Sequence, residues 1–213
     1  SAANPLHTPG LRGVALQAML GGHAFARGGR LDLRNHRKLA VIDGRLGWIG
    51  SQNLVGPVFI PGAPNLEVVT RLRGPIVAQL QAVFGSDWYI ETGEVLAPPA
   101  IVFDAASADA PGSACAQLLP SGPAYPHENA RDALLVLIQR AQRDVTLCTP
   151  YFVPDESLMR ALCVAALGGV SVRLIVSRRN NQPLVYWAQR GYYDELLRSG
   201  VRIFLHGPGF LHA

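Results

Sequence analysis

The chain has 213 residues, of which 49% are apolar and 16% are charged, with a formal net charge of +4 and a pI near 9.2. That much apolar material is enough for a sizeable core, and it excludes disorder of the whole chain, which requires few apolar residues and a high net charge. The mild basic excess favours anionic partners, either phospholipid head groups or nucleic acid, without choosing between them.

In the first half, the predicted elements are short and separated by loops rich in Gly and Pro. The expected ranges are a helix over 11–20, strands over 30–35, 38–42, 46–50 and 66–72, and a helix after Gly74-Pro75 that buries Ile76, Leu80, Val83, Phe84 and Trp88. Asp43-Gly44 is typical of a hairpin turn between two of these strands. Residues 96–112, rich in Pro, Ala, Ser and Asp, predict a linker.

In the second half, strands and helices alternate along the chain. Strands are expected over 116–119, 145–148, 170–176 and 201–205, and helices over 128–142, 155–167 and 184–198. The alternation predicts an α/β fold with mainly parallel sheets and helices on both faces. The domain organisation is therefore 1–95, a linker over 96–112, and 113–213.

The cysteines and the apolar runs bear on the cellular environment of the protein. Cys115, Cys148 and Cys163 fit no zinc-binding spacing, and the last two lie in apolar runs that predict buried, reduced thiols. No run of about 18 uncharged apolar residues predicts a membrane span, and no signal peptide is visible. Because the chain begins without Met and ends without a tail, we expect a fragment that is soluble by itself.

One segment carries residues suited to phosphodiester chemistry. His36 and Lys38 lie two apart on a predicted strand and should point to the same face. An imidazole can act as a nucleophile or proton carrier near neutral pH, and an ammonium can hold a phosphate oxygen. After the turn, Ser51 and Asn53 come near the end of the next strand, where both can donate hydrogen bonds to a phosphoryl oxygen.

The pattern His-x-Lys, four residues, Asp, six residues, Gly-Ser-x-Asn resembles the phospholipase D superfamily motif at every fixed position, namely His36, Lys38, Asp43, Gly50, Ser51 and Asn53. The segments 87–93, 120–123, 149–154 and 199–201 look like those of bacterial cardiolipin synthases of the two-motif type. Superfamily members pair two such motifs, and His212-Ala213 is expected to begin the second copy. The resemblance implies two phospholipase D-like halves, both incomplete: the C-terminal part of the first half, with its complete motif, and the N-terminal part of the second.

The resemblance also implies a mechanism that forms cardiolipin from two phosphatidylglycerol molecules. His36 would attack the phosphorus to give a phosphatidyl-histidine, and His212 would act as general acid and then general base. Lys38, Ser51 and Asn53 would hold the phosphoryl oxygens, so that no metal or other cofactor is implied. Asp43 has either a direct role or a structural role in the turn. Glu67 is the candidate to orient the nucleophilic imidazole, with a surface carboxylate as the alternative.

Two other functional hypotheses remain open. One is another phosphodiesterase of the superfamily, a phospholipase or a nuclease; a nuclease groove should be dense in Lys and Arg, whereas this chain has one Lys and eighteen scattered Arg. The other is an inactive fragment, since most of the second motif is absent. The expected partner is an anionic phospholipid, reached by a parent protein at the bacterial cell membrane with its catalytic part on the cytoplasmic side. Tyr186, Trp187, Tyr192 and Tyr193 on one predicted helix indicate either core packing or contact with the membrane interface.

Overall fold

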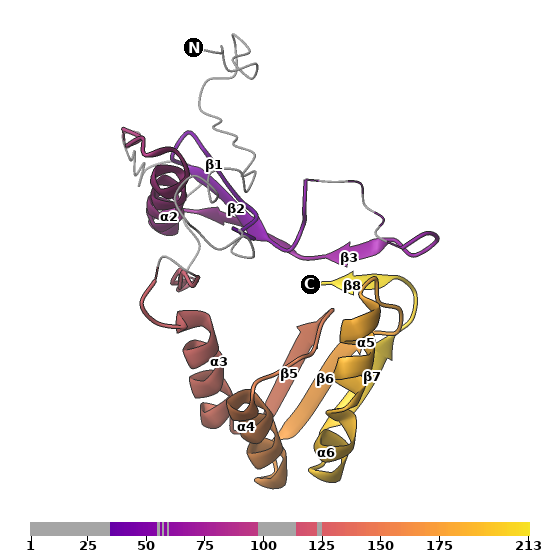
Figure 1. Cartoon of the computed structure of the whole chain (residues 1–213). Coiled ribbons are helices and arrows are strands. Elements are labelled where there is room, and N and C mark those ends of the chain that lie inside the picture. Colours follow the sequence, from indigo (N-terminus) through magenta and orange to yellow (C-terminus); the bar gives the residue numbers. More distant parts are fainter. Residues whose placement is uncertain (1–34, 55, 57, 59, 98–113, 123–124) are drawn as a thin grey trace. The chain divides into compact units, whose positions relative to one another are not determined.

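The computed structural model of the protein describes residues 35–54, 56, 58, 60–97, 114–122 and 125–213 (Figure 1). They form two compact units, each interrupted in sequence: the first contains residues 35–49 and 70–122, and the second contains residues 50–69 and 125–213. The segment 50–69 therefore joins the second unit, although the sequence places it within the first half. The predicted helix over 11–20, the predicted strand over 30–34 and most of the linker over 96–112 lie outside the described residues.

The described residues of the first unit form a three-stranded sheet and one helix. Strands β1 (Leu39–Ile42), β2 (Leu46–Gly50) and β4 (Val69–Arg73) follow one another in the sheet, and helix α2 (Ile76–Thr92) packs against β1. The predicted hairpin is confirmed, because β1 and β2 pair antiparallel around a turn in which Arg45 N–H donates to the Ile42 carbonyl at 3.0 Å. Asp43 and Gly44 both have positive φ, which is the backbone of a type I′ turn.

Helix α2 begins after Gly74-Pro75, as predicted, and its apolar face closes the first core. Ile76, Leu80 and Val83 are buried, and Leu80 has no exposed surface. Phe84 and Trp88 are half-buried. Gly47 of β2 provides the room for Leu80, since a Cβ at that glycine would lie 2.5 Å from Leu80 Cδ1.

The second unit contains a parallel sheet with four helices. Strands β5 (Asp144–Thr149), β6 (Ser171–Ser177) and β7 (Arg202–His206) are parallel neighbours, and helices α3 (Asn129–Arg140), α4 (Glu156–Leu167), α5 (Pro183–Arg190) and α6 (Tyr193–Arg198) connect or precede them. Val172, Leu174 and Val176 alternate along β6 on the face that α4 and α6 cover. A separate parallel pair is formed by β3 (Asn65–Glu67) and β8 (Phe210–His212).

Four sequence predictions about this fold are wrong, each for a physical reason. Residues 116–119 form no strand; instead, Leu118 N–H donates to the Gln79 side chain at 3.0 Å. The predicted strand over 66–72 is two strands, β3 and β4, in different sheets. The predicted helix over 184–198 is two helices, because the chain turns at Gly191-Tyr192. Cys148 is exposed, because the helices that contact the sheet within the described residues cover only the opposite face.

None of the helices in the described part of the chain combines the length and the apolar character needed to cross a membrane.

Candidate active site

The Gly-Ser step of the motif is where two backbone segments come closest. A Cβ at Gly50 would lie 2.2 Å from the carbonyl oxygen of Val68, so that only glycine fits there. The close approach allows Ser51 N–H to donate to the Val68 carbonyl at 2.9 Å, while Val68 N–H donates to Ser51 Oγ at 2.9 Å. Ser51 thus forms hydrogen bonds with both backbone groups of Val68, the residue between β3 and β4. Because Val68 pairs with Ser51 and not with a neighbouring strand, the predicted strand is divided at this residue.

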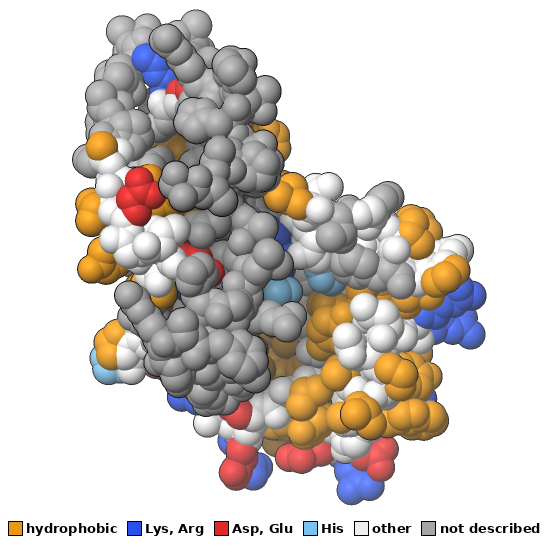
Figure 2. Space-filling view, turned by 45° about the horizontal axis from the view of Figure 1, so that its top comes forward, with side chains coloured by type: hydrophobic (Ala, Val, Ile, Leu, Met, Phe, Trp, Pro, Cys, Tyr) orange, Lys and Arg blue, Asp and Glu red, His pale blue; other side chains and the backbone are white. Residues whose placement is uncertain are grey.

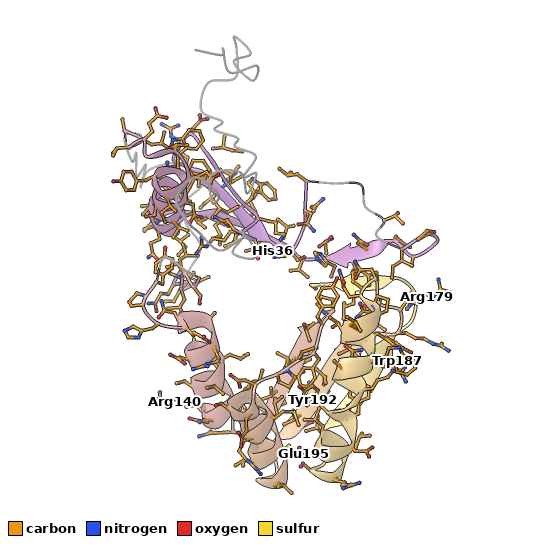
Figure 3. All side chains as sticks on the ribbon, viewed as in Figure 1. His36, Arg140, Arg179, Trp187, Tyr192 and Glu195 are labelled. Atoms are coloured by element: carbon orange, nitrogen blue, oxygen red, sulfur yellow. The ribbon has the colours of Figure 1, made fainter. Side chains whose placement is uncertain are left out.

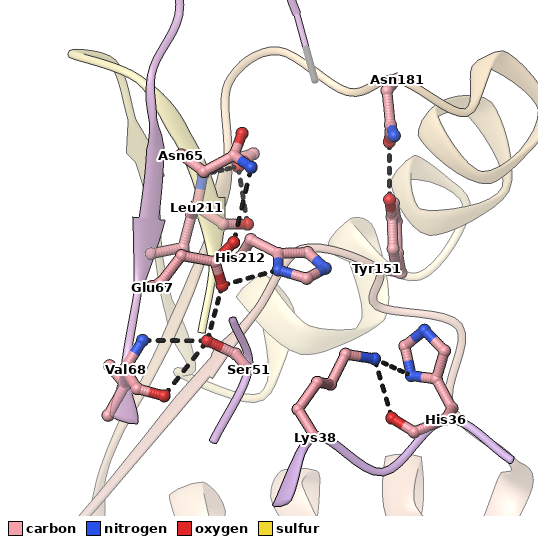
Figure 4. Close-up of polar contacts among 11 residues, drawn as sticks. His36, Lys38, Ser51, Asn65, Glu67, Val68, Tyr151, Asn181, Leu211 and His212 are labelled. Atoms are coloured by element: carbon pink, nitrogen blue, oxygen red, sulfur yellow. Dashed lines mark hydrogen bonds and ion pairs between the residues drawn. The ribbon is translucent and has the colours of Figure 1, made fainter. Parts of the chain in front are cut away.

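Glu67, the last residue of β3, is the centre of the polar network in the second unit (Figure 4). Its Oε2 accepts a hydrogen bond from Ser51 Oγ at 2.8 Å and lies 2.8 Å from Nδ1 of His212. Its Oε1 accepts from the Asn65 side chain at 3.4 Å. Two side chains distant in sequence, Ser51 and His212, together with the nearby Asn65, therefore hold one carboxylate in a fixed orientation.

The register of a parallel strand pair places Glu67 beside His212. Asn65, Leu66 and Glu67 are aligned with Phe210, Leu211 and His212. Strand β8 is anchored from its other side, because Leu211 N–H donates to the buried Ser177 Oγ at 2.6 Å. His212 is only 9% exposed and stacks on the Phe210 ring at a centroid distance of 5.9 Å. This packing fixes the plane of the imidazole.

The ionisation of the Glu67 carboxyl decides which nitrogen of the His212 imidazole faces it as a donor. Partial burial by itself would raise the pKa of the Glu67 carboxyl, but hydrogen bonds from His212, Ser51 and Asn65, with the charge of His212, outweigh it and lower the pKa below 4.5. An ionised carboxylate only accepts hydrogen bonds, so Nδ1 of His212 donates to it. The neutral imidazole then keeps its lone pair on Nε2, where it is able to accept or return a proton.

In the first unit, His36 and Lys38 precede β1 rather than lying within it, but they meet as the two-residue spacing predicts (Figure 4). Lys38 Nζ lies 2.8 Å from Nδ1 of His36 and donates to the His36 carbonyl at 2.7 Å. Since an ammonium only donates, Nδ1 of His36 accepts, and the neutral ring carries its proton on Nε2. The two histidines therefore have opposite tautomers.

Arg37, between these two residues, holds the segment in place. Its guanidinium forms an ion pair with Asp87 of α2 at 2.6 Å and donates to the Ser121 carbonyl at 2.7 Å. Asp87 is buried, with 8% of its surface exposed, and the guanidinium of Arg37 provides its partner inside the fold. Arg37 thus fixes the segment that carries His36 and Lys38 to α2.

Two motif residues take no part in the hydrogen bonds of these clusters within the described part of the chain. Asp43 is exposed at the hairpin turn, five positions along the chain from Lys38, which corresponds to roughly 16 Å of extended strand. Asn53 is half-buried in the loop two residues after Ser51.

The expected roles of Glu67 and Ser51 change with the geometry. Glu67 was expected to orient His36, but the imidazole that its carboxylate binds is that of His212. Ser51 was expected to donate to a phosphoryl oxygen, but its single hydroxyl proton goes to Glu67 in this structure.

Sequence reasoning missed Arg37, Asp87 and Ser177. Arg37 and Asp87 carried a usable signal, because both stand within segments that the resemblance singled out, next to His36 and Trp88 respectively. Ser177, at the end of a buried strand, gave none, since its partner is the backbone of a strand 34 residues away.

The amino-acid sequence of the chain is similar to those of known proteins. Residues 134–213 match the family model described as "Cardiolipin synthase, PLD-like domain". The chain is 38% identical over 193 residues to cardiolipin synthase A of Pectobacterium carotovorum subsp. carotovorum (strain PC1), covering 89% of this chain and 39% of that protein. It is also 38% identical over 198 residues to cardiolipin synthase A of Buchnera aphidicola subsp. Baizongia pistaciae (strain Bp), covering 90% of this chain and 40% of that protein.

A solved structure supports the fold independently. Phosphatidylserine synthase of Haemophilus influenzae Rd KW20 superimposes with a TM-score of 0.52 at 16% identity, over 83% of this chain and 50% of that chain. The chain spans about two fifths of the length of the curated relatives that it matches. Its sequence similarity shows that the chain belongs to the phospholipase D-like family that includes the bacterial cardiolipin synthases.

Proposed function

We propose that the protein containing this chain is a phosphatidyltransferase that forms cardiolipin from two phosphatidylglycerol molecules. The observation that carries the proposal is the imidazole of His212, oriented by an ionised carboxylate, in a chain whose other motif histidine lies beside an ammonium. The names of the curated relatives support the choice of cardiolipin as product. The working site is that of the parent protein at the bacterial cell membrane, with its catalytic part on the cytoplasmic side.

In the first step, Nε2 of His36 attacks the phosphorus of one phosphatidylglycerol. The bond between phosphorus and the glycerol oxygen breaks, His212 gives its Nε2 proton to that oxygen, and free glycerol leaves. The enzyme then carries a phosphatidyl group on His36. Glu67 stabilises the protonated His212 that this step requires and returns it to the same orientation afterwards.

In the second step, the terminal glycerol hydroxyl of another phosphatidylglycerol attacks the same phosphorus. His212, now neutral, takes the hydroxyl proton, the bond between phosphorus and His36 breaks, and cardiolipin leaves. One imidazole thus acts as acid and then as base, which restores the starting protonation state.

Lys38 has a part in making His36 nucleophilic. In the substrate-free geometry, its ammonium occupies Nδ1 of His36, which leaves the proton on Nε2. A phosphoryl oxygen attracts the ammonium more strongly than a neutral imidazole does, so substrate binding would draw Lys38 away. The proton of His36 is then free to move to Nδ1, and Nε2 gains the lone pair that attacks. Asn53 is the neutral donor proposed for the phosphoryl oxygens.

The test uses the full-length protein and phosphatidylglycerol labelled at phosphorus. Wild-type protein should release glycerol and cardiolipin in equal amounts. Digestion at mildly alkaline pH, at which the phosphorus–nitrogen bond of phosphohistidine survives, should recover label on a peptide containing His36. His36→Ala and His212→Ala should each lower turnover by about a thousandfold or more, because each removes a group that reacts in both steps. His127→Ala, an exposed histidine outside both clusters, is the matched control and should be fully active.

Three outcomes would revise the proposal. Full activity of His36→Ala would exclude His36 as the nucleophile. Label on the His212 peptide instead would exchange the two roles. Phosphatidic acid in place of cardiolipin would identify a phospholipase.

A further inference from the structure

Helix α5 exposes an apolar face at the surface of the second unit. Leu184 is 86% exposed and Trp187 is 69% exposed, and their spacing of three residues puts them on one side of the helix. The opposite side is anchored, because the buried Gln189 accepts a hydrogen bond from Phe152 N–H at 3.4 Å. Helix α5 is therefore held firmly with two large apolar side chains directed to solvent.

Arginines lie before helix α5 and at its end. Arg178 and Arg179 follow β6 directly and are exposed, and Arg190 lies in the last turn of α5 with its guanidinium 4.3 Å from the centre of the Tyr186 ring. Within the described residues, neither Arg178 nor Arg179 forms an ion pair. From residue 157 to residue 193, the sequence contains no Asp or Glu, so Arg178 and Arg179 have no acidic neighbour along the chain.

Figures 2 and 3 are consistent with a surface that combines apolar and cationic side chains. Arg179 and Trp187 both lie at the outer margin of the second unit in Figure 3. Exposed hydrophobic side chains adjoin Lys or Arg side chains in the space-filling view of Figure 2. We call Leu184, Trp187, Arg178, Arg179 and Arg190 the α5 surface.

The α5 surface borders the strand that carries His212. Arg178 N–H donates to the His206 carbonyl at 2.9 Å, and the preceding Ser177 binds Leu211 of β8. Asn181, at the start of α5, accepts a hydrogen bond from Tyr151 at 2.6 Å, and Tyr151 contacts the Phe210 ring at 6.1 Å (Figure 4). A ligand held on the α5 surface would therefore lie near His212 within the same unit.

We infer that the α5 surface docks on the surface of an anionic phospholipid bilayer. The inference rests on the proposed function only in that the substrate is a phospholipid. Trp favours the level of the head groups, a Leu beside it enters the acyl region, and Arg guanidinium groups pair with lipid phosphates. A second copy of the chain fits less well, because a two-fold contact would place three arginines against the same three arginines.

The experiment measures sedimentation of the 213-residue chain with vesicles of phosphatidylglycerol and phosphatidylcholine, and with vesicles of phosphatidylcholine alone. Wild-type chain should bind the anionic vesicles, and added salt should weaken the binding. Arg178→Gln/Arg179→Gln should weaken it by about tenfold or more, since each basic residue near an anionic surface contributes roughly fivefold. Leu184→Ser/Trp187→Ser should weaken it by at least about tenfold, through loss of apolar contact.

Matched control pairs lie elsewhere in the same unit. Val164→Ser/Leu167→Ser changes two residues of α4 with the same spacing and with exposures of 58% and 72%. Arg140→Gln/Arg143→Gln removes two exposed arginines at the end of α3. Both controls should bind vesicles like wild type, and circular dichroism should show all four variants folded. Equal loss in the controls, or no loss in the α5 variants, would overturn the inference.

Two more measurements exclude other occupants and separate this inference from the proposed function. Light scattering of the wild-type chain without lipid should give a monomer; a dimer abolished by Leu184→Ser/Trp187→Ser would assign the surface to a second copy instead. In mixed micelles of detergent and phosphatidylglycerol, full-length protein with the α5 substitutions should keep the turnover of wild type. On vesicles, the same variants should lose turnover. Absence of cardiolipin in both media, with vesicle binding intact, would contradict the proposed function but leave docking supported.

Discussion

At the scale of single residues, the hydroxyl of Ser51 links the motif of the first half to the histidine of the second. It donates to Glu67 and accepts from the backbone of Val68, and Glu67 in turn binds His212. Ser51 is thus a positioning residue that acts on His212 through the carboxylate. In the proposed mechanism, a fixed His212 imidazole favours turnover, because proton transfer to a leaving oxygen is sensitive to small displacements of the donor.

Replacing Ser51 with Ala should destabilise the fold by about 1–3 kcal/mol, because a half-buried carboxylate and a backbone N–H each lose a hydrogen bond. The loss also removes one cause of the lowered pKa of Glu67, so acid unfolding should begin at a higher pH than in wild type. Urea unfolding at several pH values measures both effects. Gln52→Ala, at the adjacent exposed residue, is the control; equal stability of Ser51→Ala and wild type would exclude the positioning role.

The pKa of Glu67 gives a pH dependence with a definite sign. Because the folded pKa lies below 4.5, the carboxylate contributes stability that is fully present above about pH 4.5 and is lost as the pH falls through the folded value. Wild-type protein should lose thermal stability in that window, and Glu67→Gln, which has no proton to bind, should lose less. Glu195→Gln, on the exposed surface of α6, should keep the wild-type profile. Parallel profiles for wild type and Glu67→Gln would contradict the assignment.

At the scale of elements, the junction between β3 and β4 depends on glycine at residue 50. The approach of Gly50 to Val68 lets one extended stretch contribute to two sheets, since Ser51 satisfies the backbone of Val68 that the ladders leave open. Periodicity over 66–72 indicates a single strand because side-chain alternation continues across the junction. The break comes from a backbone contact with a segment 17 residues earlier, which periodicity does not encode.

Two glycine substitutions should have opposite effects on stability. Gly50→Ala should cost about 1–3 kcal/mol or more, because its Cβ would meet backbone that cannot move independently. Gly85→Ala, inside α2 with open space at its Cβ, should stabilise by about 0.5–1 kcal/mol, since alanine loses less entropy in a helix. Chemical denaturation of both variants is the measurement. A neutral Gly50→Ala would show that the two segments separate easily.

At the scale of the whole molecule, the chain forms two compact units with separate cores. Leu80 is fully buried under the sheet of the first unit, and Leu162 of α4 is buried in the second. The chain passes between the units at residues 49–50, at residues 69–70 and between residues 122 and 125. Two cores of this kind are able to open separately even though the chain joins them three times.

Leu80→Ala and Leu162→Ala should each cost about 2–5 kcal/mol in the unit that they belong to. Hydrogen exchange followed by mass spectrometry should show faster exchange in β1, β2 and α2 for Leu80→Ala, and in β5, β6 and α4 for Leu162→Ala. Each variant serves as the control for the other. Equal acceleration in both units, for either variant, would mean that the molecule opens as a single cooperative unit.

The sequence by itself determined the local features of the fold and the contact within the motif. Asp43-Gly44 predicts the hairpin because only a few residues tolerate positive φ at both turn positions, and the spacing of Ile76, Leu80 and Val83 predicts the buried face of α2. The two-residue spacing of His36 and Lys38 placed them in contact. Each of these features depends on neighbours within one turn or one strand.

The tertiary structure alone decided which imidazole Glu67 binds. Glu67 and His212 are 145 residues apart and meet through a parallel pairing of two three-residue strands, of which β8 was not predicted. Such a short strand has too few residues for a visible alternation, and parallel pairing leaves no turn signal between its partners. The sequence therefore identified His212 and Glu67 as candidates, but only the register of β3 on β8 joined them into one site.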